Sequence, residues 1–322
     1  LVDAFHGRED LAAGVLRCVG EPSLRFEEDA LRILRALRFA SVYDFRIEEK
    51  TSEAIHALYP TLTRVAAERI RAELGKLLCG RAAAGILRAY PDVLHTILPE
   101  TAAMYGFEQH TPHHAYDVWE HTLHALSAAP VDETLRFAIL LHDVGKPEAF
   151  TLDGKGVGHM YGHAKLSAEK AESAMARLKM DRATWEDVVL LVEKHDLPLE
   201  AERKMMKHRL NQLGERRLRL LIQLQRADAL GKGTEEPEAV EARTKQQEAV
   251  LTELLAENAC VTLKQLAVSG RDLMQAGVPA GKQIGVVLNA LLVEVMDEKT
   301  PNERESLLQR AKQLQAAGGV YG

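Results

Sequence analysis

The sequence predicts an all-α protein. Its 322 residues are 46% hydrophobic but only 5% aromatic, and Leu, Ala and Glu are abundant. Apolar residues recur at helical spacing through most of the chain, and strands are expected only at its extreme start. A chain of this length normally divides into two or three domains.

The N-terminal third contains two clear amphipathic patterns. Residues 25–45 place Phe26, Leu31, Leu34 and Leu37 on one side, which predicts a single helix with a buried face. Residues 61–80 predict a second helix that ends at Gly80. Shorter helices are expected around 82–90 and 93–100, and the Gly/His-rich segment 104–117 is expected to be a loop.

Helical patterns continue through the rest of the chain. They are expected at about 116–128, 133–144, 165–179, 183–195 and 214–230. A turn at 153–166 interrupts them, and 231–242 is expected to be a linker or an exposed helix start. The last portion is helical except for a Gly-punctuated loop-and-helix unit at 268–285.

Composition limits the classes of function. The formal net charge of −6 gives no global signal for nucleic acid, so such binding needs a local basic patch. The three cysteines lie far apart in no metal-binding spacing, which favours the reducing cytoplasm. No apolar stretch reaches about 18 residues, so no membrane span or membrane partner is predicted. The chain opens abruptly on Leu1 rather than Met, and we expect an upstream segment to be missing.

In the segment AILLHDVGKPEAF, residues 138–150, an apolar helix is followed at its C-terminal end by His142 and Asp143. Gly145 and Pro147 are expected to stop that helix. Further ionisable residues fall on the core-facing sides of other helices or beside them: His121, His163, His195 and Asp228. Burial of a single unpaired carboxylate costs several kcal/mol, roughly, so a shared divalent cation would neutralise such a cluster. The alternative for any one of these histidines is an ordinary core histidine, and for Asp228 an ion pair or a cap.

The order of these residues resembles the HD superfamily of metal-dependent phosphohydrolases, whose pattern is H…HD…D with two further histidines. The resemblance implies phosphoester hydrolysis in a helical bundle, with His142 and Asp143 as catalytic residues and Asp143 bridging two ions. It implies one or two divalent ions, Mn, Ni, Co, Fe or Mg, held by His121, His142, Asp143, His163, His195 and Asp228. Lys146 could reach a phosphate, or could be a lysine that stabilises a helix C-terminus.

A second motif lies near the start of the chain. Asp29 and Arg32 are spaced i,i+3, which by itself fits a surface ion pair. A carboxylate and a guanidinium held together also match the hydrogen-bonding edge of C, and with a small shift that of A. The spacing alone favours the ion pair.

The longer segment RCVGEPSLRFEEDALRILRALRFA resembles the neck of class II tRNA nucleotidyltransferases, the CCA-adding enzymes and bacterial poly(A) polymerases. The resemblance makes 17–22 a flexible link and implies a protein template for incoming ATP or CTP. The implied nucleotide-binding residues are Glu28, Asp29, Arg32, Arg64 and Arg69, with Glu68 and Glu73 as further polar positions of the neck. The C-terminal segment also resembles the family's tail, which would contact tRNA.

The family's catalytic head carries a DxD pair that holds two Mg ions, and this sequence has no two aspartates at that spacing. We therefore expect a missing or separate head to be needed for nucleotide transfer. The predicted architecture is a head remnant and hinge (1–20), a helical neck (21–105), an HD-superfamily bundle (106–232) and a helical tail (233–322).

A local basic segment supports an RNA partner. Residues 203–232 contain nine Lys or Arg and two acidic residues. Arg216, Arg217 and Arg219 are the predicted contacts to a phosphate backbone. The alternative is a solvated helix face.

The sequence therefore predicts the C-terminal part of a tRNA nucleotidyltransferase with an embedded HD phosphohydrolase, acting on tRNA and nucleotides in the cytoplasm. One alternative is a free-standing HD phosphohydrolase for cyclic nucleotides or small phosphoesters. Another is a non-enzymatic RNA-binding subunit that partners a separate head.

Overall fold

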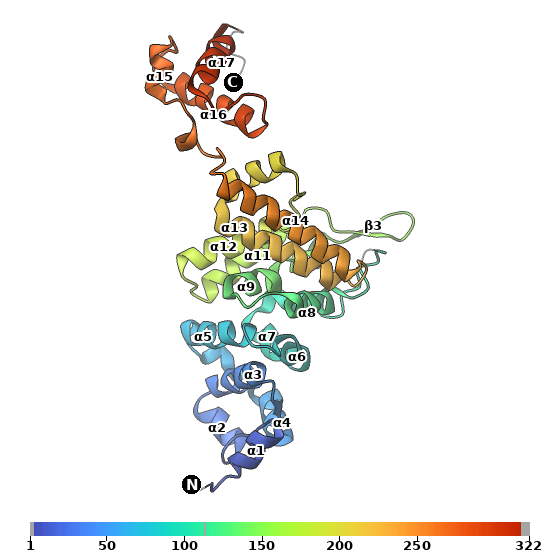
Figure 1. Cartoon of the computed structure of the whole chain (residues 1–322). Coiled ribbons are helices and arrows are strands. Elements are labelled where there is room, and N and C mark those ends of the chain that lie inside the picture. The colour runs from blue at the N-terminus through green and yellow to red at the C-terminus, as the bar shows by residue number, and fades with distance from the viewer. Residues whose placement is uncertain (1–2, 113, 317–322) are drawn as a thin grey trace. The chain divides into compact units, whose positions relative to one another are not determined.

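The computed structural model describes residues 3–112 and 114–316 and confirms the all-α prediction (Figure 1). The chain divides into two compact units. The first comprises residues 1–197 and 223–241, and the second comprises 198–222 and 242–322, each without the residues outside the described ranges. No helix in the described ranges combines the length and the apolar character needed to cross a bilayer.

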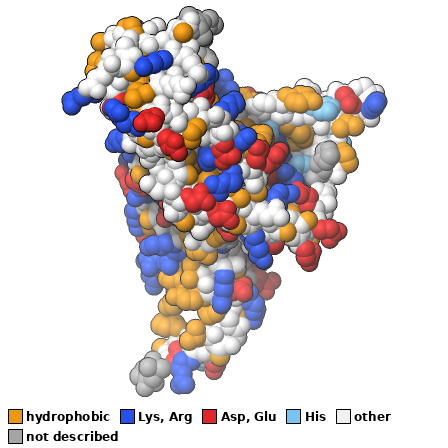
Figure 2. Space-filling model, turned by 45° about the horizontal axis from the view of Figure 1, so that its top comes forward, with side chains coloured by type: hydrophobic (Ala, Val, Ile, Leu, Met, Phe, Trp, Pro, Cys, Tyr) orange, Lys and Arg blue, Asp and Glu red, His pale blue; other side chains and the backbone are white. Residues whose placement is uncertain are grey.

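The first unit begins with short helices: α1 (Gly7–Ala13), α2 (Pro22–Glu28), α3 (Leu31–Tyr43), α4 (Glu49–Leu58), η1 (Tyr59–Arg64), α5 (Ala67–Leu78), α6 (Ala83–Ala89), α7 (Pro91–Ile97) and η2 (Pro99–Met104). Strand β1 (Val15–Leu16) pairs in parallel with β2 (Arg46–Ile47). On the face shown in Figure 2, hydrophobic side chains and Lys or Arg side chains lie together over these N-terminal helices.

The single helix expected over 25–45 is two helices, because the chain leaves helical geometry at Asp29 (φ −152°, ψ 101°). The Asp29 carboxylate accepts a hydrogen bond from the backbone N–H of Leu31, at 3.1 Å, at the start of α3. Asp competes in this way with intrahelical hydrogen bonds. The predicted apolar face is nevertheless buried, from Phe26 through Leu34 to Leu37.

The bundle of the first unit contains α8 (Val118–Ala128), α9 (Glu133–Leu141), α10 (Lys146–Ala149), α11 (His163–Arg177), α12 (Arg182–Lys194) and the later part of α13 (Arg203–Lys232). Aspartates cap three of these helices, since Asp117, Asp132 and Asp181 each accept a backbone N–H three residues later. Pro147 was expected to stop the helix that contains Leu140 and Leu141, but it does not have this role. It lies in the first turn of α10, where its missing N–H costs little.

The turn expected at 153–166 contains a β-hairpin that the helical pattern did not reveal. Strand β3 (Thr151–Leu152) pairs antiparallel with β4 (Gly158–His159). The expectation of strands only at the extreme start is therefore wrong here and at β2. Figure 1 shows the hairpin extending to one side of the bundle helices α8, α9 and α11.

Arg136 joins the bundle to the N-terminal helices. Its side chain is only 5% exposed, although a guanidinium is always charged. It donates hydrogen bonds to carbonyl oxygens at the ends of α5 and α8, those of Leu78, Gly80, Ala129 and Pro130. This one side chain thus satisfies helix-end carbonyls from two parts of the fold.

The second unit holds the earlier part of α13, the later part of α14 (Pro237–Ala256), η3 (Leu263–Gln265), α15 (Gly270–Gln275), α16 (Lys282–Met296) and α17 (Arg304–Ala316). Helix α13 is kinked at Gly214 (φ 74°, ψ 165°), the residue where a helix was expected to begin. The start of α14 at Pro237 agrees with the exposed helix start expected in 231–242.

Candidate metal centre and nucleotide-template region

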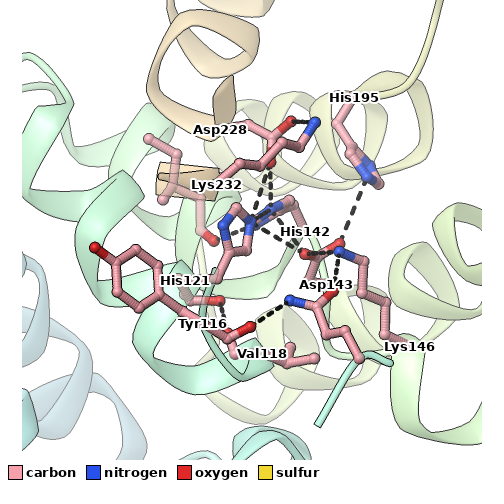
Figure 3. Close-up of polar contacts among 12 residues, drawn as sticks. Tyr116, Val118, His121, His142, Asp143, Lys146, His195, Asp228 and Lys232 are labelled. Carbon is pink, nitrogen blue, oxygen red and sulfur yellow. Dashed lines mark hydrogen bonds and ion pairs between the residues drawn. The ribbon is translucent and has the colours of Figure 1, made fainter. Parts of the chain in front are cut away.

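The histidines and aspartates of the HD-like pattern converge inside the first unit (Figure 3). His121 comes from α8, His142 and Asp143 follow α9, and Asp228 lies on α13. The Nε2 atom of His121 lies 3.3 Å from Oδ2 of Asp143 and 3.1 Å from Oδ1 of Asp228. The corresponding distances from Nε2 of His142 are 3.2 and 3.4 Å.

A second group shares Asp143 with the first. Oδ1 of Asp143 lies 3.4 Å from Nε2 of His163, at the start of α11, and 3.7 Å from Nε2 of His195, which follows α12. One donor atom from each member of a group lies within 4.8 Å of the others, for His121, His142, Asp143 and Asp228, and for Asp143, His163 and His195. The structure therefore brings together all six predicted metal-binding residues, with Asp143 common to both groups.

Two close backbone approaches allow this convergence. A Cβ atom at Gly145, in the turn after Asp143, would lie 2.6 Å from the His163 carbonyl oxygen. A Cβ atom at Gly231 would lie 2.9 Å from the His121 carbonyl oxygen. The absence of side chains at these positions lets the Asp143 turn approach α11, and lets α13 bring Asp228 against α8.

Hydrogen bonds orient three of the four histidines. Nδ1 of His142 lies 2.7 Å from the Ile139 carbonyl oxygen, and the rings of His163 and His195 make the same contact to the carbonyl three residues earlier. An Nδ1–H donor in each leaves Nε2 as a lone-pair donor that faces the cluster.

The donor set fits divalent cations. Nε2 of His163 lies 3.1 Å from that of His195, and Nε2 of His121 lies 3.2 Å from that of His142, so lone pairs would oppose one another without an intervening proton or cation. Oδ1 of Asp143 is buried without a hydrogen-bond partner among the described residues, whereas Oδ2 pairs with the ammonium group of Lys146. Donors on one cation at about 2.1 Å lie roughly 3.0–3.4 Å apart, close to the separations found here.

The electrostatics of the cluster favour a bound positive charge. Burial would lower the pKa of His142, but Asp143 and Asp228 raise it to about 10. Burial would raise the pKa of Asp143, but His142 and Lys146 hold it well below its usual range. Two ionised carboxylates therefore share a largely buried site, and in the absence of a cation a proton on His142 would balance part of their charge.

Two lysines lie beside the carboxylates of the cluster (Figure 3). Nζ of Lys146 lies 2.6 Å from Oδ2 of Asp143 and donates to Oε1 of Gln109 at 2.9 Å. Nζ of Lys232 lies 2.8 Å from Oδ2 of Asp228. Lys146 is thus buried beside the candidate metal ligands, where its ammonium group could also meet a phosphate.

Sequence reasoning missed one carboxylate at the second group. The Asp196 carboxylate lies 3.4 Å from Nε2 of both His163 and His195, and its side chain is 57% exposed. The repeated His-Asp dipeptide, at 142–143 and again at 195–196, was the available signal. Lys232 was also missed, because a single lysine near a helix end carries no distinctive pattern.

A pocket of about 320 Å³ opens onto the cluster. Its lining combines four candidate ligands with further polar residues and part of the chain near the hairpin: Asp143, His163, His195, Asp228, Lys146, Lys232, His114, Asp196, Thr111, Gly158, Met160, Tyr161 and Gly162. Burial lowers the pKa of His114 to about 3, so this ring is neutral at pH 7.

The residues predicted to form a nucleotide template, Asp29 and Arg32, lie at the junction of α2 and α3. The Asp29 carboxylate meets Arg69 of α5 at 2.9 Å, and Arg32 meets Glu28 at 2.7 Å. The simple i,i+3 pair therefore does not describe the contacts of Asp29 and Arg32. Both side chains are partly exposed, with 31% for Asp29 and 40% for Arg32, and can reach a ligand.

Helix α5 supports the template motif. Arg38 of α3 forms an ion pair with Glu73 of α5, and both side chains are largely buried. Together with the Asp29–Arg69 pair, this contact fixes α5 against the start and middle of α3. Glu68 instead pairs with Lys179 at 2.7 Å, and Arg64 is exposed at the end of η1.

The predicted RNA-binding arginines, Arg216, Arg217 and Arg219, follow the kink of α13 in the second unit. Arg219 pairs with Glu215 at 2.9 Å, and Arg216 and Arg217 also have partners. Elsewhere on the basic segment, Lys207 pairs with Glu298 at 2.8 Å. Part of the positive charge of the segment 203–232 is thus balanced by acidic residues of the protein. RNA binding by Arg216, Arg217 and Arg219 stays a prediction.

Comparisons with known proteins find relatives of this chain among tRNA-processing enzymes. Residues 44–104 match the family model described as probable RNA and SrmB-binding site of polymerase A. Residues 159–311 match that of tRNA nucleotidyltransferase domain 2 (putative). The fold is also similar to a crystal structure of the Bacillus stearothermophilus CCA-adding enzyme in complex with CTP, with a TM-score of 0.70 and 23% identity over 98% of this chain and 69% of that one.

Two curated relatives are more informative about family. The chain is 33% identical to an A-adding tRNA nucleotidyltransferase of Deinococcus radiodurans, over 96% of this chain and 74% of the relative. It is also 33% identical to a CC-adding tRNA nucleotidyltransferase of Thermus thermophilus, over 92% of this chain and 69% of the relative. These matches define a tRNA-processing class of protein. The chain belongs to the tRNA nucleotidyltransferase family.

Proposed function

We propose that this chain supplies the nucleotide-template and tRNA-binding parts of a tRNA nucleotidyltransferase that adds or repairs the 3′-terminal CCA, and that its bundle carries a metal-dependent phosphohydrolase site. The observation that carries the second part is Asp143, which belongs to both groups of metal donors. The two activities use different residues of the chain.

The template proposal rests on Asp29 and Arg32, with Glu28, Arg64 and Arg69 beside them. A carboxylate and a guanidinium can accept from and donate to the hydrogen-bonding edge of CTP or ATP. Because the relatives include both an A-adding and a CC-adding enzyme, similarity alone does not choose between the nucleotides. Transfer also needs Mg-binding carboxylates, and we propose that a catalytic head, in the same chain or as a separate subunit, provides them.

The hydrolase proposal rests on what the residues of the pocket can do. Divalent ions such as Mn, Ni, Co, Fe or Mg would activate water and take charge from phosphoryl oxygens. His121, His142, Asp143 and Asp228 would hold one ion, and Asp143, His163 and His195 a second. The ammonium groups of Lys146 and Lys232 lie in the same pocket and can bind phosphate oxygens.

The free-standing hydrolase is less well supported than the embedded site. The two 33% identical relatives match at least 92% of the chain, which includes the neck and the tail as well as the bundle. A hydrolase acting alone needs neither a nucleotide template nor an RNA-binding region.

The test separates the two activities. His142→Ala and Asp143→Ala should abolish metal-dependent hydrolysis of bis-p-nitrophenyl phosphate while tRNA affinity stays unchanged. Joint replacement of Arg216, Arg217 and Arg219 by Gln should weaken tRNA binding and leave metal-dependent hydrolysis unchanged. Equal loss of hydrolysis and tRNA binding in the His142 or Asp143 variants would contradict separate sites, and a protein that binds no metal would favour an RNA-binding subunit.

A further inference from the structure

A stacked pair of rings, of which the tyrosine is exposed, lies beside the candidate metal pocket. Tyr161 lines this pocket and is 82% exposed. Its ring is nearly parallel to that of His159, with an interplanar angle of 6° and 5.3 Å between centroids. His159 thus covers one face of the tyrosine ring, and the high exposure leaves the other face open.

The β3–β4 hairpin fixes the backing ring. Oδ1 of Asp153 accepts hydrogen bonds from the backbone N–H groups of Lys155 and Val157, at 2.8 and 3.0 Å. Oδ2 of the same carboxylate lies 3.2 Å from Nε2 of His159. The hairpin turn therefore holds His159 in place, and His159 in turn orients Tyr161. In Figure 2, the β3–β4 hairpin extends to the right and carries histidine and charged side chains.

The pocket brings Tyr161 together with the ammonium groups of Lys146 and Lys232. Its lining combines the buried candidate ligands Asp143 and Asp228 and the ammonium groups of Lys146 and Lys232 with the exposed ring of Tyr161. Its volume of about 320 Å³ is close to the lower end of small-molecule pockets, roughly 300–1,000 Å³. That size suits one nucleotide unit, with its phosphate inside and its flat ring outside.

We propose that Tyr161, backed by His159, binds the ring of the substrate, so that the hydrolase site selects phosphoesters that carry a nucleobase. The inference rests on the proposed phosphohydrolase function and names its substrate class. An aromatic face accepts any base because every base has a π-face, and such stacking changes affinity by about 5- to 150-fold. Sugar phosphates and inorganic phosphate offer no aromatic ring to Tyr161.

The experiment compares three probes on the Mn-loaded protein by calorimetry: AMP, ribose 5-phosphate and inorganic phosphate. The wild type should bind AMP at least about fivefold more tightly than ribose 5-phosphate. Tyr161→Ala should remove this preference and leave the affinity for inorganic phosphate unchanged, and Tyr161→Phe should retain it. Tyr105→Ala is the matched control, because Tyr105 is 59% exposed but lies outside the pocket lining.

Each outcome bears on the inference. A preference for AMP that survives Tyr161→Ala would overturn it, since the nucleotide would then be bound elsewhere, for example at Asp29. Equal affinities for AMP and ribose 5-phosphate in the wild type would also overturn it. Failure to bind Mn or inorganic phosphate would overturn the metal centre itself, and the ring inference with it.

A three-nucleotide RNA that ends in adenosine distinguishes two sources of the base. Tighter Tyr161-dependent binding of this RNA than of AMP would assign the site to an RNA end. Tighter Tyr161-dependent binding of AMP would assign it to a free nucleotide. Loss of Tyr161 dependence for both probes would refute the role of the ring.

Discussion

Replacement of Asp143 by Asn tests the shared position of this carboxylate. The amide keeps the shape of the side chain but removes its charge and most of its affinity for a cation. The first donor group would retain His121, His142 and Asp228, and the second only His163 and His195. Residues that merely orient a metal ligand change affinity by roughly 10- to 100-fold, so loss of a direct donor should weaken each ion by at least about 100-fold, or about 2.7 kcal/mol.

The assay is metal content after dialysis, combined with a Mn titration followed by electron paramagnetic resonance. Wild-type protein should bind an ion at each of the two donor groups, and Asp143→Asn should bind neither at micromolar metal. His163→Ala should lose only the ion held by Asp143, His163 and His195. Asp187→Asn is the matched control, because Asp187 is a buried aspartate of α12 outside the cluster. An Asp143→Asn variant that keeps both ions at wild-type affinity would refute the reasoning.

Three further predictions concern packing and charge. Gly145→Ala should lower the free energy of unfolding by about 1–3 kcal/mol in a urea titration, because its Cβ would overlap α11. Gly85→Ala, where a Cβ has open space within a helix, should not destabilise the protein. Arg136→Leu should cost about 3–5 kcal/mol, because several buried carbonyl oxygens lose their donor; a loss below about 1 kcal/mol would contradict this role. Arg69→Ala should raise the pKa of Asp29, which burial raises and Arg69 lowers, as carboxyl NMR titration can measure. Stability should change by less than about 1 kcal/mol, because the pair is partly exposed.

Much of the helical architecture was predictable because apolar spacing is a local property of the sequence. The pattern around Leu34 and Leu37 marked a buried face, and the helices near His121, His163 and His195 were found within a few residues of their observed ends. The break at Asp29 was missed, because apolar residues continue on both sides of it and conceal a side chain that bonds to the backbone.

Family membership agrees with the motif read from residues 17–40, since the chain is 33% identical to curated tRNA nucleotidyltransferases. The roles of Asp29 and Arg32 in nucleotide binding stay a prediction. Arg69 was predicted as a polar residue of the same region, and the structure adds its direct pairing with Asp29 from 40 residues away, a contact that no local spacing specifies.

The sequence by itself determined the helical class, the family and the identity of the candidate metal ligands, because residue type and order carry that information. Only the tertiary structure decided that Asp143 belongs to both donor groups, since this depends on how separate helices pack around one turn. It also brought in Asp196, Lys232 and Tyr161, whose significance depends on the pocket they share. Ligand chemistry is encoded residue by residue, but the site is formed by long-range packing.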